Sequence, residues 1–387
     1  MRINETSGLV LRLAVFYAAL FVLPGVQMPF FPVWLKANGV DAGMIGIVLA
    51  APIAARLLAV PLIMREADRR NAVRAGLIAC GFAATAGYVL VGLSAGAAFI
   101  FVAYTLTSLA TTPQMPLAET YALKNLTVRG RAYGPVRLWG SFAFIGGNFI
   151  AGFAADVIPA RDLIWLIVAA SAVIAIAAVG LPPMAAPVTE QDSRLSTRTS
   201  LVRDRPFVAV VVAASLIQAS HAMYYGFSAV QWSAAGFDGT LIAALWALGV
   251  LAEIVLFAMQ SRLPPIFEPT VLLVVGAVGG ALRWMGMTFD PPVSVLAALQ
   301  LLHALSFGAT HLGALMFLVR HAPPKQAATA QGYLAIAAGL AMAAAMALSG
   351  LLYRDFESTA YAAMALLALA GGAGGLVAHR MRGDTSR

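Results

Sequence analysis

Twelve long apolar segments constrain this chain more than any other feature of its sequence. Each has the roughly 20 mostly apolar residues that an α-helix needs to cross the hydrocarbon core of a bilayer. Strands of a membrane β-barrel need only about 9–11 residues, so these lengths predict helices. The segments cover residues 9–33, 43–64, 73–94, 97–122, 135–157, 162–181, 206–233, 239–260, 269–289, 292–319, 327–351 and 358–379.

The composition agrees with a chain that has lipid as its main solvent. Hydrophobic residues make up 61% of the sequence and charged residues 11%, whereas soluble proteins are about 45–50% apolar and about 25% charged. The net charge of +8 does not indicate a nucleic-acid partner, because the basic residues occupy short loops and form no continuous face. The single cysteine, Cys80, excludes an intrachain disulfide and a cysteine metal cluster.

The positions of Lys and Arg predict the orientation of the chain. If the N-terminus is cytoplasmic, most of the 25 basic residues fall on the cytoplasmic side, and only Lys36, Arg161 and Arg354 fall outside. Both termini are then cytoplasmic. The polar stretch at 182–205 divides the segments six and six. We therefore expect an N-terminal six-helix bundle (1–181), a cytoplasmic linker (182–205) and a C-terminal six-helix bundle (206–387).

Ionisable residues inside three consecutive segments of the second half need a functional or structural reason. A charge at the bilayer centre costs about 2.5–3.5 kcal/mol, so such residues face the bundle interior or water. Glu253, Arg283 and His303 lie in successive segments, and we expect them to meet. Desolvation favours the neutral form of a carboxyl group and a nearby cation opposes it, which is what proton coupling requires. A permanent Glu253–Arg283 salt bridge that orients the helices is the alternative.

His303 and His311 share one segment with Phe307. On an α-helix the histidines are about 80° apart around the axis and about 12 Å along it. Together with Phe307 they predict a polar stripe that carries an aromatic ring and lines a cavity, where His311 and Phe307 contact a substrate. A metal site is not expected, because the histidines are two turns apart and no carboxylate stands beside either of them. A packed hydrogen bond between helices is the alternative for each histidine.

A second group of polar residues is expected in the first half. Glu119 follows Pro113 and Pro116, and Arg137 begins the next segment, so a Glu119–Arg137 contact would either bind substrate or act as a cytoplasmic gate. A surface salt bridge of little energetic value is the alternative. Gln27 lies among three prolines that are expected to kink the first helix. Arg56 either extends to the cytoplasmic face or pairs with an acid across the bundle.

Several stretches of the sequence resemble the major facilitator superfamily and, within it, the phenylpropionate permease family. They are "GVQMPFFPVWLKANGVDAGMIG" (25–46), "APIAARLLAVPLI" (51–63), "MPLAETYALKN" (115–125), "YGPVRLWGSFAFIGGNFIAG" (133–152), "LLHALSFGATHLGALMFL" (301–318) and "KQAATAQGYLA" (325–335). The phenylpropionate permeases are related to the lactose permease group of proton symporters. The resemblance implies a major facilitator fold, that is, an all-α membrane protein of twelve transmembrane helices.

The resemblance also implies roles for individual residues. Lactose-permease-like transporters use a carboxylate and an arginine in spans 4 and 5, which Glu119 and Arg137 match. They use a carboxylate, an arginine and a histidine in spans 8, 9 and 10, which Glu253, Arg283 and His303 match. The carboxylate that those transporters carry later in span 10 has no counterpart here, so their proton mechanism does not transfer directly.

The superfamily's loop motif G-x-x-x-D-R-x-G-R-R is degenerate here. It reads "MREADRRNAVR" at 64–74, with Asp68 and Arg69 in place but Met64 and Asn71 where the glycines stand. We assign Asp68, Arg69 and Arg56 to a cytoplasmic gate.

The function we expect is proton-coupled uptake of a small organic solute, an aromatic or other organic acid of the phenylpropionate kind, by alternating access. The alternatives are proton-driven efflux of a drug or metabolite, and sugar or nucleoside symport. An enzyme is not expected, because the chain has no H-E-x-x-H, no G-x-S-x-G and no glycine loop for a nucleotide. We expect that the protein needs no cofactor. Its expected partners are protons and the lipid bilayer, and we expect a monomer that spans the inner (plasma) membrane many times.

Overall fold

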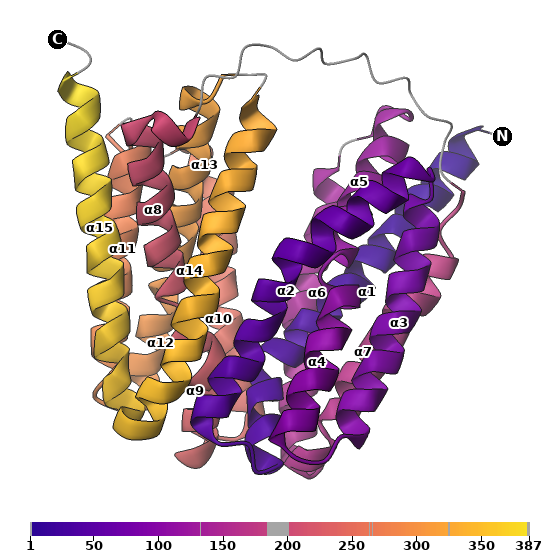
Figure 1. Ribbon diagram of the computed structural model, residues 1–387, viewed down its shortest axis with the longest axis horizontal. Coiled ribbons are helices and arrows are strands. Elements are labelled where there is room, and N and C mark those ends of the chain that lie inside the picture. Colours follow the sequence, from indigo (N-terminus) through magenta and orange to yellow (C-terminus); the bar gives the residue numbers. More distant parts are fainter. Residues whose placement is uncertain are drawn as a thin grey trace. The chain divides into compact units, whose positions relative to one another are not determined.

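The protein is described here by a computed structural model that covers residues 2–131, 133–183, 201–262, 264, 266–323 and 326–384. Within these residues every regular element is helical (Figure 1). The α-helices are α1 (Arg2–Ala37), α2 (Ala42–Arg69), α3 (Val73–Leu93), α4 (Ala97–Thr111), α5 (Gln114–Thr127), α6 (Gly134–Val157), α7 (Ile164–Val179), α8 (Arg205–Ala219), α9 (Ala222–Ala234), α10 (Gly239–Met259), α11 (Pro269–Met287), α12 (Val293–Leu301), α13 (Thr310–His321), α14 (Ala327–Phe356) and α15 (Tyr361–Asp384). A π-helical turn, η4 (Ala304–Ala309), joins α12 to α13.

Ten helical segments of the described chain are long and apolar enough to cross a membrane. The predicted segment 97–122 is not one of them, because it is divided into α4 and α5, which have 15 and 14 residues. The predicted segment 358–379 and all but the first two residues of 327–351 fall within one stretch of 53 residues, Thr329–Met381. The count of twelve crossings therefore stays a prediction.

The chain divides into two compact units. The first consists of Met1–Glu190 and Trp232–Ala244, and the second of Gln191–Gln231 and Leu245–Arg387. Most of the predicted linker, residues 184–200, lies outside the described residues. Each unit is considered by itself below.

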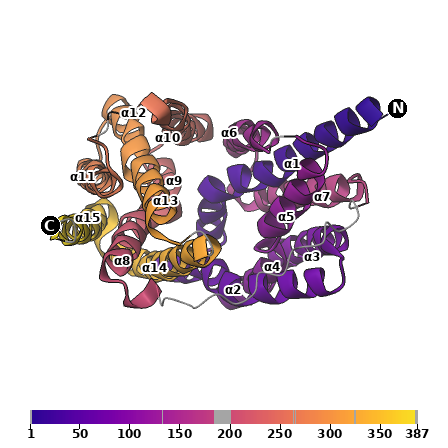
Figure 2. The same ribbon diagram turned by 90° about the horizontal axis from the view of Figure 1, so that it is seen from above.

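In the first unit, α1 packs against α6 and α7, and α3 packs against α4 and α7 (Figure 2). The helix α1 stays continuous through Pro24, Pro29 and Pro32. A close approach between α1 and α6 depends on Gly147, where an added Cβ would lie 2.6 Å from the carbonyl oxygen of Val22. Small residues let membrane helices approach in this way.

Asp156, near the end of α6, caps the first turn of α10. Its carboxylate accepts hydrogen bonds from the backbone N–H of Gly239 (2.5 Å) and Thr240 (3.1 Å) and from the Thr240 hydroxyl (2.7 Å). The first N–H groups of a helix have no partner within the helix, so a carboxylate there stabilises it.

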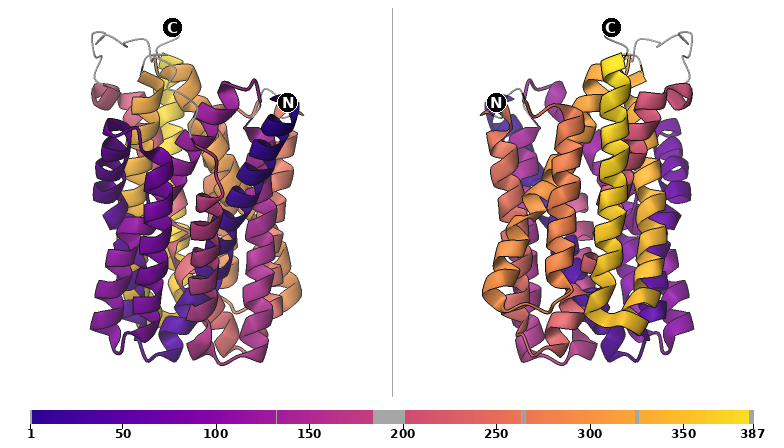
Figure 3. Two further views of the ribbon diagram at one scale, coloured as in Figure 1. Left: turned by 90° about the vertical axis from the view of Figure 1, so that its right-hand side faces the viewer. Right: turned by 90° about the vertical axis from the view of Figure 1, so that its left-hand side faces the viewer.

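In the second unit, α15 packs against α8 and α11, and its yellow ribbon stands in front in the right-hand view of Figure 3. The glycine-rich stretch 370–376 makes this contact possible. A Cβ at Gly371 would lie 2.6 Å from the Ile217 side chain, and one at Gly372 would lie 2.7 Å from the Cβ of Ala277. This stretch therefore serves helix packing.

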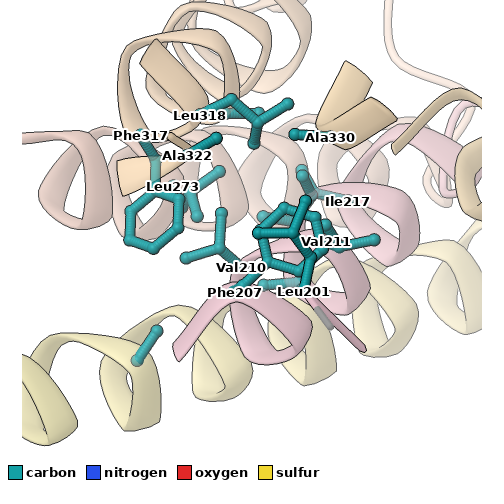
Figure 4. Close-up of a cluster of buried hydrophobic side chains, with 14 of the residues drawn as sticks. Leu201, Phe207, Val210, Val211, Ile217, Leu273, Phe317, Leu318, Ala322 and Ala330 are labelled. Atoms are coloured by element: carbon teal, nitrogen blue, oxygen red, sulfur yellow. The ribbon is translucent and has the colours of Figure 1, made fainter. Parts of the chain in front are cut away.

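A cluster of buried apolar side chains fills the space between α8, α11, α13 and α14 (Figure 4). It includes Phe207 and Val210 from α8, Leu273 from α11, Phe317 from α13 and Ala330 from α14. Since lipid provides little hydrophobic driving force between helices, close packing of such side chains holds the unit together.

Three predicted helices are interrupted. Pro113 separates α4 from α5, as the prolines before Glu119 indicated. Ser220 and His221 separate α8 from α9, and the π-turn η4 separates α12 from α13. The last two interruptions were not predicted, because both local sequences are apolar enough to read as continuous helix.

Candidate functional site

Arg283, on α11, is the centre of a polar cluster inside the second unit. Its side chain is fully buried, with a relative exposure of 0%. Its Nη2 donates to Gln300 Oε1 at 2.6 Å, and its Nη1 lies 2.9 Å from His303 Nδ1. Gln300, also fully buried, donates in turn to the carbonyl oxygen of Leu296 at 3.3 Å. Both acceptors of the guanidinium are therefore neutral groups that are fixed in place.

His303 stands between Arg283 and Glu253. A guanidinium has only donors, so His303 Nδ1 must accept the hydrogen bond from Arg283. The proton of the neutral ring is then on Nε2, which lies 3.4 Å from Glu253 Oε2. The side chain of Glu253 is 21% exposed and that of His303 is 9% exposed. The predicted trio thus meets as a chain in the order Arg283, His303, Glu253, with the carboxylate at the more open end.

Aromatic rings surround the guanidinium. The Cζ atom of Arg283 lies 4.4 Å from the ring centroid of Tyr224 and 4.6 Å from that of Trp284. The ring of Tyr224 stacks on Trp246 at 4.7 Å. Cation–π contacts of this kind stabilise a desolvated charge. The sequence did not indicate these rings or Gln300 as part of the cluster, although Trp284 directly follows Arg283 in the chain.

The rings of His303, Phe307 and His311 form a stacked column on one side of η4. The first pair of centroids is 5.2 Å apart and the second 5.9 Å, with interplanar angles of 16° and 10°. The predicted separation of about 80° between the histidines assumed an α-helix. The π-turn between them breaks that assumption, because it has more residues per turn. The column runs from buried His303 to exposed His311, whose ring also lies 6.2 Å from that of Phe257.

In the first unit, Glu119 and Arg137 do not form the direct ion pair that the sequence suggested. Both side chains are partly buried, and Arg137 and Arg56 are near enough to Glu119 for an electrostatic interaction. However, no salt bridge joins Glu119 to either arginine within the described residues. The guanidinium of Arg137 instead lies 4.0 Å above the ring of Phe21 on α1. Stacking on this ring replaces the expected carboxylate contact.

Gln27 joins two buried tyrosines. Its Nε2 donates to the hydroxyl of Tyr104 at 2.7 Å, and the hydroxyl of Tyr88 donates to its Oε1 at 3.0 Å. The ring of Tyr104 lies 4.5 Å from that of Phe31. The sequence placed Gln27 among the prolines of α1 but did not identify its partners, which come from α3 and α4.

Two of the predicted gate residues, Asp68 and Arg69, lie at the end of α2, and the third, Arg56, lies in the middle of that helix. Asp68 is 3.8 Å from Lys124 on α5, and Arg69 donates to Glu66 at 2.9 Å. Arg56 is exposed. Asn71 has a φ of 49°, in the left-handed region that glycine adopts without strain. Asn is one of the residues that tolerates this region best, which explains how it can stand where the superfamily motif has its inner glycine.

Within the described residues, no group of three or more His, Cys, Asp or Glu side chains is arranged to hold a metal ion.

The chain belongs to the MFS_1 like family, whose model matches residues 10–364. A relative from Escherichia coli (strain K12) named "Probable 3-phenylpropionic acid transporter" is 29% identical over 361 residues, which cover 92% of this chain and 94% of the relative. The "Maltose permease" of Geobacillus stearothermophilus is 29% identical over 336 residues, which cover 84% and 83% of the two chains.

Solved structures show the same fold. The nucleoside transporter NupG superposes with a TM-score of 0.84 at 16% identity and covers 96% of this chain and 99% of its own. A bacterial homologue of the lysosomal transporter Spinster, in an inward-facing and occupied conformation, gives a TM-score of 0.77 at 14% identity, with 97% of both chains covered. The chain is therefore a multi-pass membrane transporter of small solutes, not an enzyme.

Proposed function

We propose that the chain crosses the membrane twelve times as two six-helix bundles with both termini in the cytoplasm. The division of 97–122 into α4 and α5 leaves a combined length sufficient for one crossing. The stretch Thr329–Met381 covers most of α14 and α15, which run in opposite directions on either side of a short turn at Glu357–Ala360 (Figure 1). Counting each as one crossing gives the proposed topology, and the excess of basic residues on one side supports its orientation.

We propose further that the protein couples inward proton movement to uptake of an organic acid across the inner membrane. The observation that carries this proposal is the buried chain from Arg283 through His303 to Glu253. Glu253, at its more open end, is the proton carrier. His303 holds the carboxylate by donating from Nε2 while it is ionised, and that interaction weakens when Glu253 takes up a proton. Glu253 therefore has two states, an ionised one held by His303 and a protonated one held less strongly, and each state can favour a different conformation of the protein.

The proposed substrate is a small aromatic acid of the phenylpropionate kind. The relative from Escherichia coli supports this chemical class. Phe307 and His311 present stacked rings at the more exposed end of their column, where an aromatic group can pack. Glu119, Arg137 and Gln27 are the proposed polar contacts of the first unit, with Arg137 as the cation for a carboxylate. Arg56, Asp68 and Arg69 are proposed to act in the cytoplasmic gate, and the protein is proposed to work as a monomer.

The test is accumulation of radiolabelled 3-phenylpropionic acid by proteoliposomes under an imposed pH gradient, inside alkaline. The wild-type protein should concentrate the acid in the lumen. Glu253→Gln should abolish concentrative uptake but preserve the exchange of lumenal for external acid. Glu268→Gln serves as the matched control, because Glu268 is exposed before α11. Concentrative uptake by Glu253→Gln would show that Glu253 is not the proton carrier.

Sugar or nucleoside symport is the second candidate, because the maltose permease matches this chain at the same identity as the first relative. The same vesicles distinguish the two when maltose and uridine replace the aromatic acid. Accumulation of either, without accumulation of 3-phenylpropionic acid, would replace the proposed substrate class. Proton-driven efflux predicts instead that substrate and proton fluxes run in opposite directions.

A further inference from the structure

A second buried histidine, His221, lies at the break between α8 and α9 and has no role in the function proposed above. Its exposed fraction is 0%. Its Nδ1 lies 3.1 Å from the carbonyl oxygen of Gln218 and 3.3 Å from that of Ile217. Carbonyl oxygens only accept hydrogen bonds, so Nδ1 carries the proton. His221 Nε2 is then an acceptor in the neutral ring, and it lies 3.1 Å from Ser306 Oγ, which must donate to it.

The residue that His221 contacts belongs to the π-turn η4. A π-turn departs from the hydrogen bonding of the flanking α-helix, so contacts from outside the helix help to hold this form. The last turn of α8 and the break that follows it supply two such contacts. His221 accepts from the Ser306 hydroxyl, and Gln218 Nε2 donates to the carbonyl oxygen of Phe307 at 3.4 Å. Both partners lie on one side of the turn and come from neighbouring residues of the chain.

The π-turn begins directly after His303, so whatever holds the turn also holds that ring. The centroids of His221 and His303 are 5.6 Å apart with an interplanar angle of 78°, and His221 meets Trp284 edge-on at 5.0 Å. The Trp284 indole donates to Ser220 Oγ at 2.9 Å. Two consecutive residues at the helix break thus contact the side chains of His303 and Trp284, both of which contact Arg283.

We infer that His221 is a positioning residue that acts through Ser306. It keeps the turn Ala304–Ala309 in its π-helical form, and this form places His303 between Arg283 and Glu253. If the turn relaxed to an α-helix, the residues that follow would rotate relative to His303, and the stacked column would separate. The inference rests on the proposed function only where it concerns coupling. The contact of His221 with Ser306 in the π-turn, which we call the interlock, is independent of the substrate.

The interlock is tested by hydrogen–deuterium exchange of the full-length protein in nanodiscs. In His221→Ala and in Ser306→Ala, the amides of residues 304–310 should exchange about tenfold faster or more, because the turn opens more easily. His221→Gln should stay close to wild type, since its Oε1 can accept from Ser306. Ser215→Ala is the matched control, because Ser215 is a buried α8 serine whose hydroxyl has no described partner. Unchanged exchange in both His221→Ala and Ser306→Ala would overturn the inference.

A transport measurement separates positioning from general structural support. His221→Ala should reduce concentrative uptake of 3-phenylpropionic acid by about tenfold or more, whereas adding it to Glu253→Gln should leave exchange of the acid unchanged. If His221 had only a structural role, the double variant would also lose exchange of the acid, and that result would overturn the positioning role. Concentrative uptake by the single variant Glu253→Gln would refute the proposed function. The hydrogen–deuterium exchange test of the interlock would still be valid.

Discussion

The hydrogen bonds of Arg283 fix the protonation of its neighbour. Because the guanidinium donates to Nδ1, the imidazole of His303 acts as a neutral bridge that accepts on one side and donates on the other. A protonated ring would direct an N–H at the arginine. His303 is therefore suited to orient the Glu253 carboxylate, and the proton that moves is the one on Glu253.

A glutamine can imitate this bridge. In His303→Gln, Oε1 can accept from Arg283 and Nε2 can donate to Glu253, so we expect coupled uptake to stay within about threefold of wild type. His303→Ala, which can do neither, should lose it. Uptake assays in proteoliposomes test both variants. If the glutamine variant is as inactive as the alanine variant, the imidazole itself must carry the proton.

The geometry of Arg283 matters as well as its charge. Two guanidinium nitrogens reach two different acceptors, and the planar group lies against two aromatic rings. Lysine keeps the charge but has a single ammonium group. We expect Arg283→Lys to lower kcat for uptake by about tenfold or more. Arg262→Lys, at an exposed position after α10, should have no effect. Wild-type kcat in Arg283→Lys would show that charge alone suffices.

The sequence was sufficient to predict that Glu253, Arg283 and His303 meet, because their segments are consecutive and their charges need shelter from lipid. It did not predict their order. The position of His303 between the other two depends on side-chain conformations and on the π-turn, and no local pattern in "HALSFGATHLG" signals that turn. The sequence was not sufficient for Glu119 and Arg137. Their segments are consecutive, but Phe21 on α1 lies against the guanidinium of Arg137.

At the scale of the helices, neighbouring glycines have opposite roles. A Cβ at Gly147 would meet the carbonyl oxygen of Val22 at 2.6 Å, whereas one at Gly146 would meet nothing within 4 Å. The backbone atoms of α1 cannot move aside as a flexible side chain could. The spacing of apolar residues predicts both as part of one helix, and only the packing of α1 on α6 distinguishes them.

These two glycines provide a matched test of the packing. Gly147→Ala should lower the free energy of unfolding by about 1–3 kcal/mol, because it forces α1 and α6 apart. Gly146→Ala should leave stability unchanged or raise it slightly, since alanine favours helix by about 1 kcal/mol over glycine. Thermal unfolding in detergent measures both. Equal unfolding temperatures for the two variants would contradict the close approach of α1 and α6.

At the scale of the whole molecule, composition alone indicated a membrane protein, and the family match shows a transporter fold. Apolar length predicted where the chain is helical. It could not predict the break between α8 and α9, because hydropathy is insensitive to a one- or two-residue interruption.

The proposed topology makes a prediction of its own. Green fluorescent protein fused after residue 387 should fluoresce, and alkaline phosphatase fused at the same point should be inactive, because the C-terminus is proposed to be cytoplasmic. Phosphatase inserted after Arg161, between α6 and α7, should be active. An active phosphatase at the C-terminus would overturn the orientation.

The central claim is that movement of the solute and of a proton are one event that depends on Glu253. The most direct measurement is the lumenal pH of proteoliposomes without any imposed gradient, recorded with a trapped dye as 3-phenylpropionate is added outside. We predict that the lumen acidifies with the wild-type protein and with Glu268→Gln, and that it does not with Glu253→Gln. Solute entry without acidification in the wild type, or equal acidification with Glu253→Gln, would contradict the account.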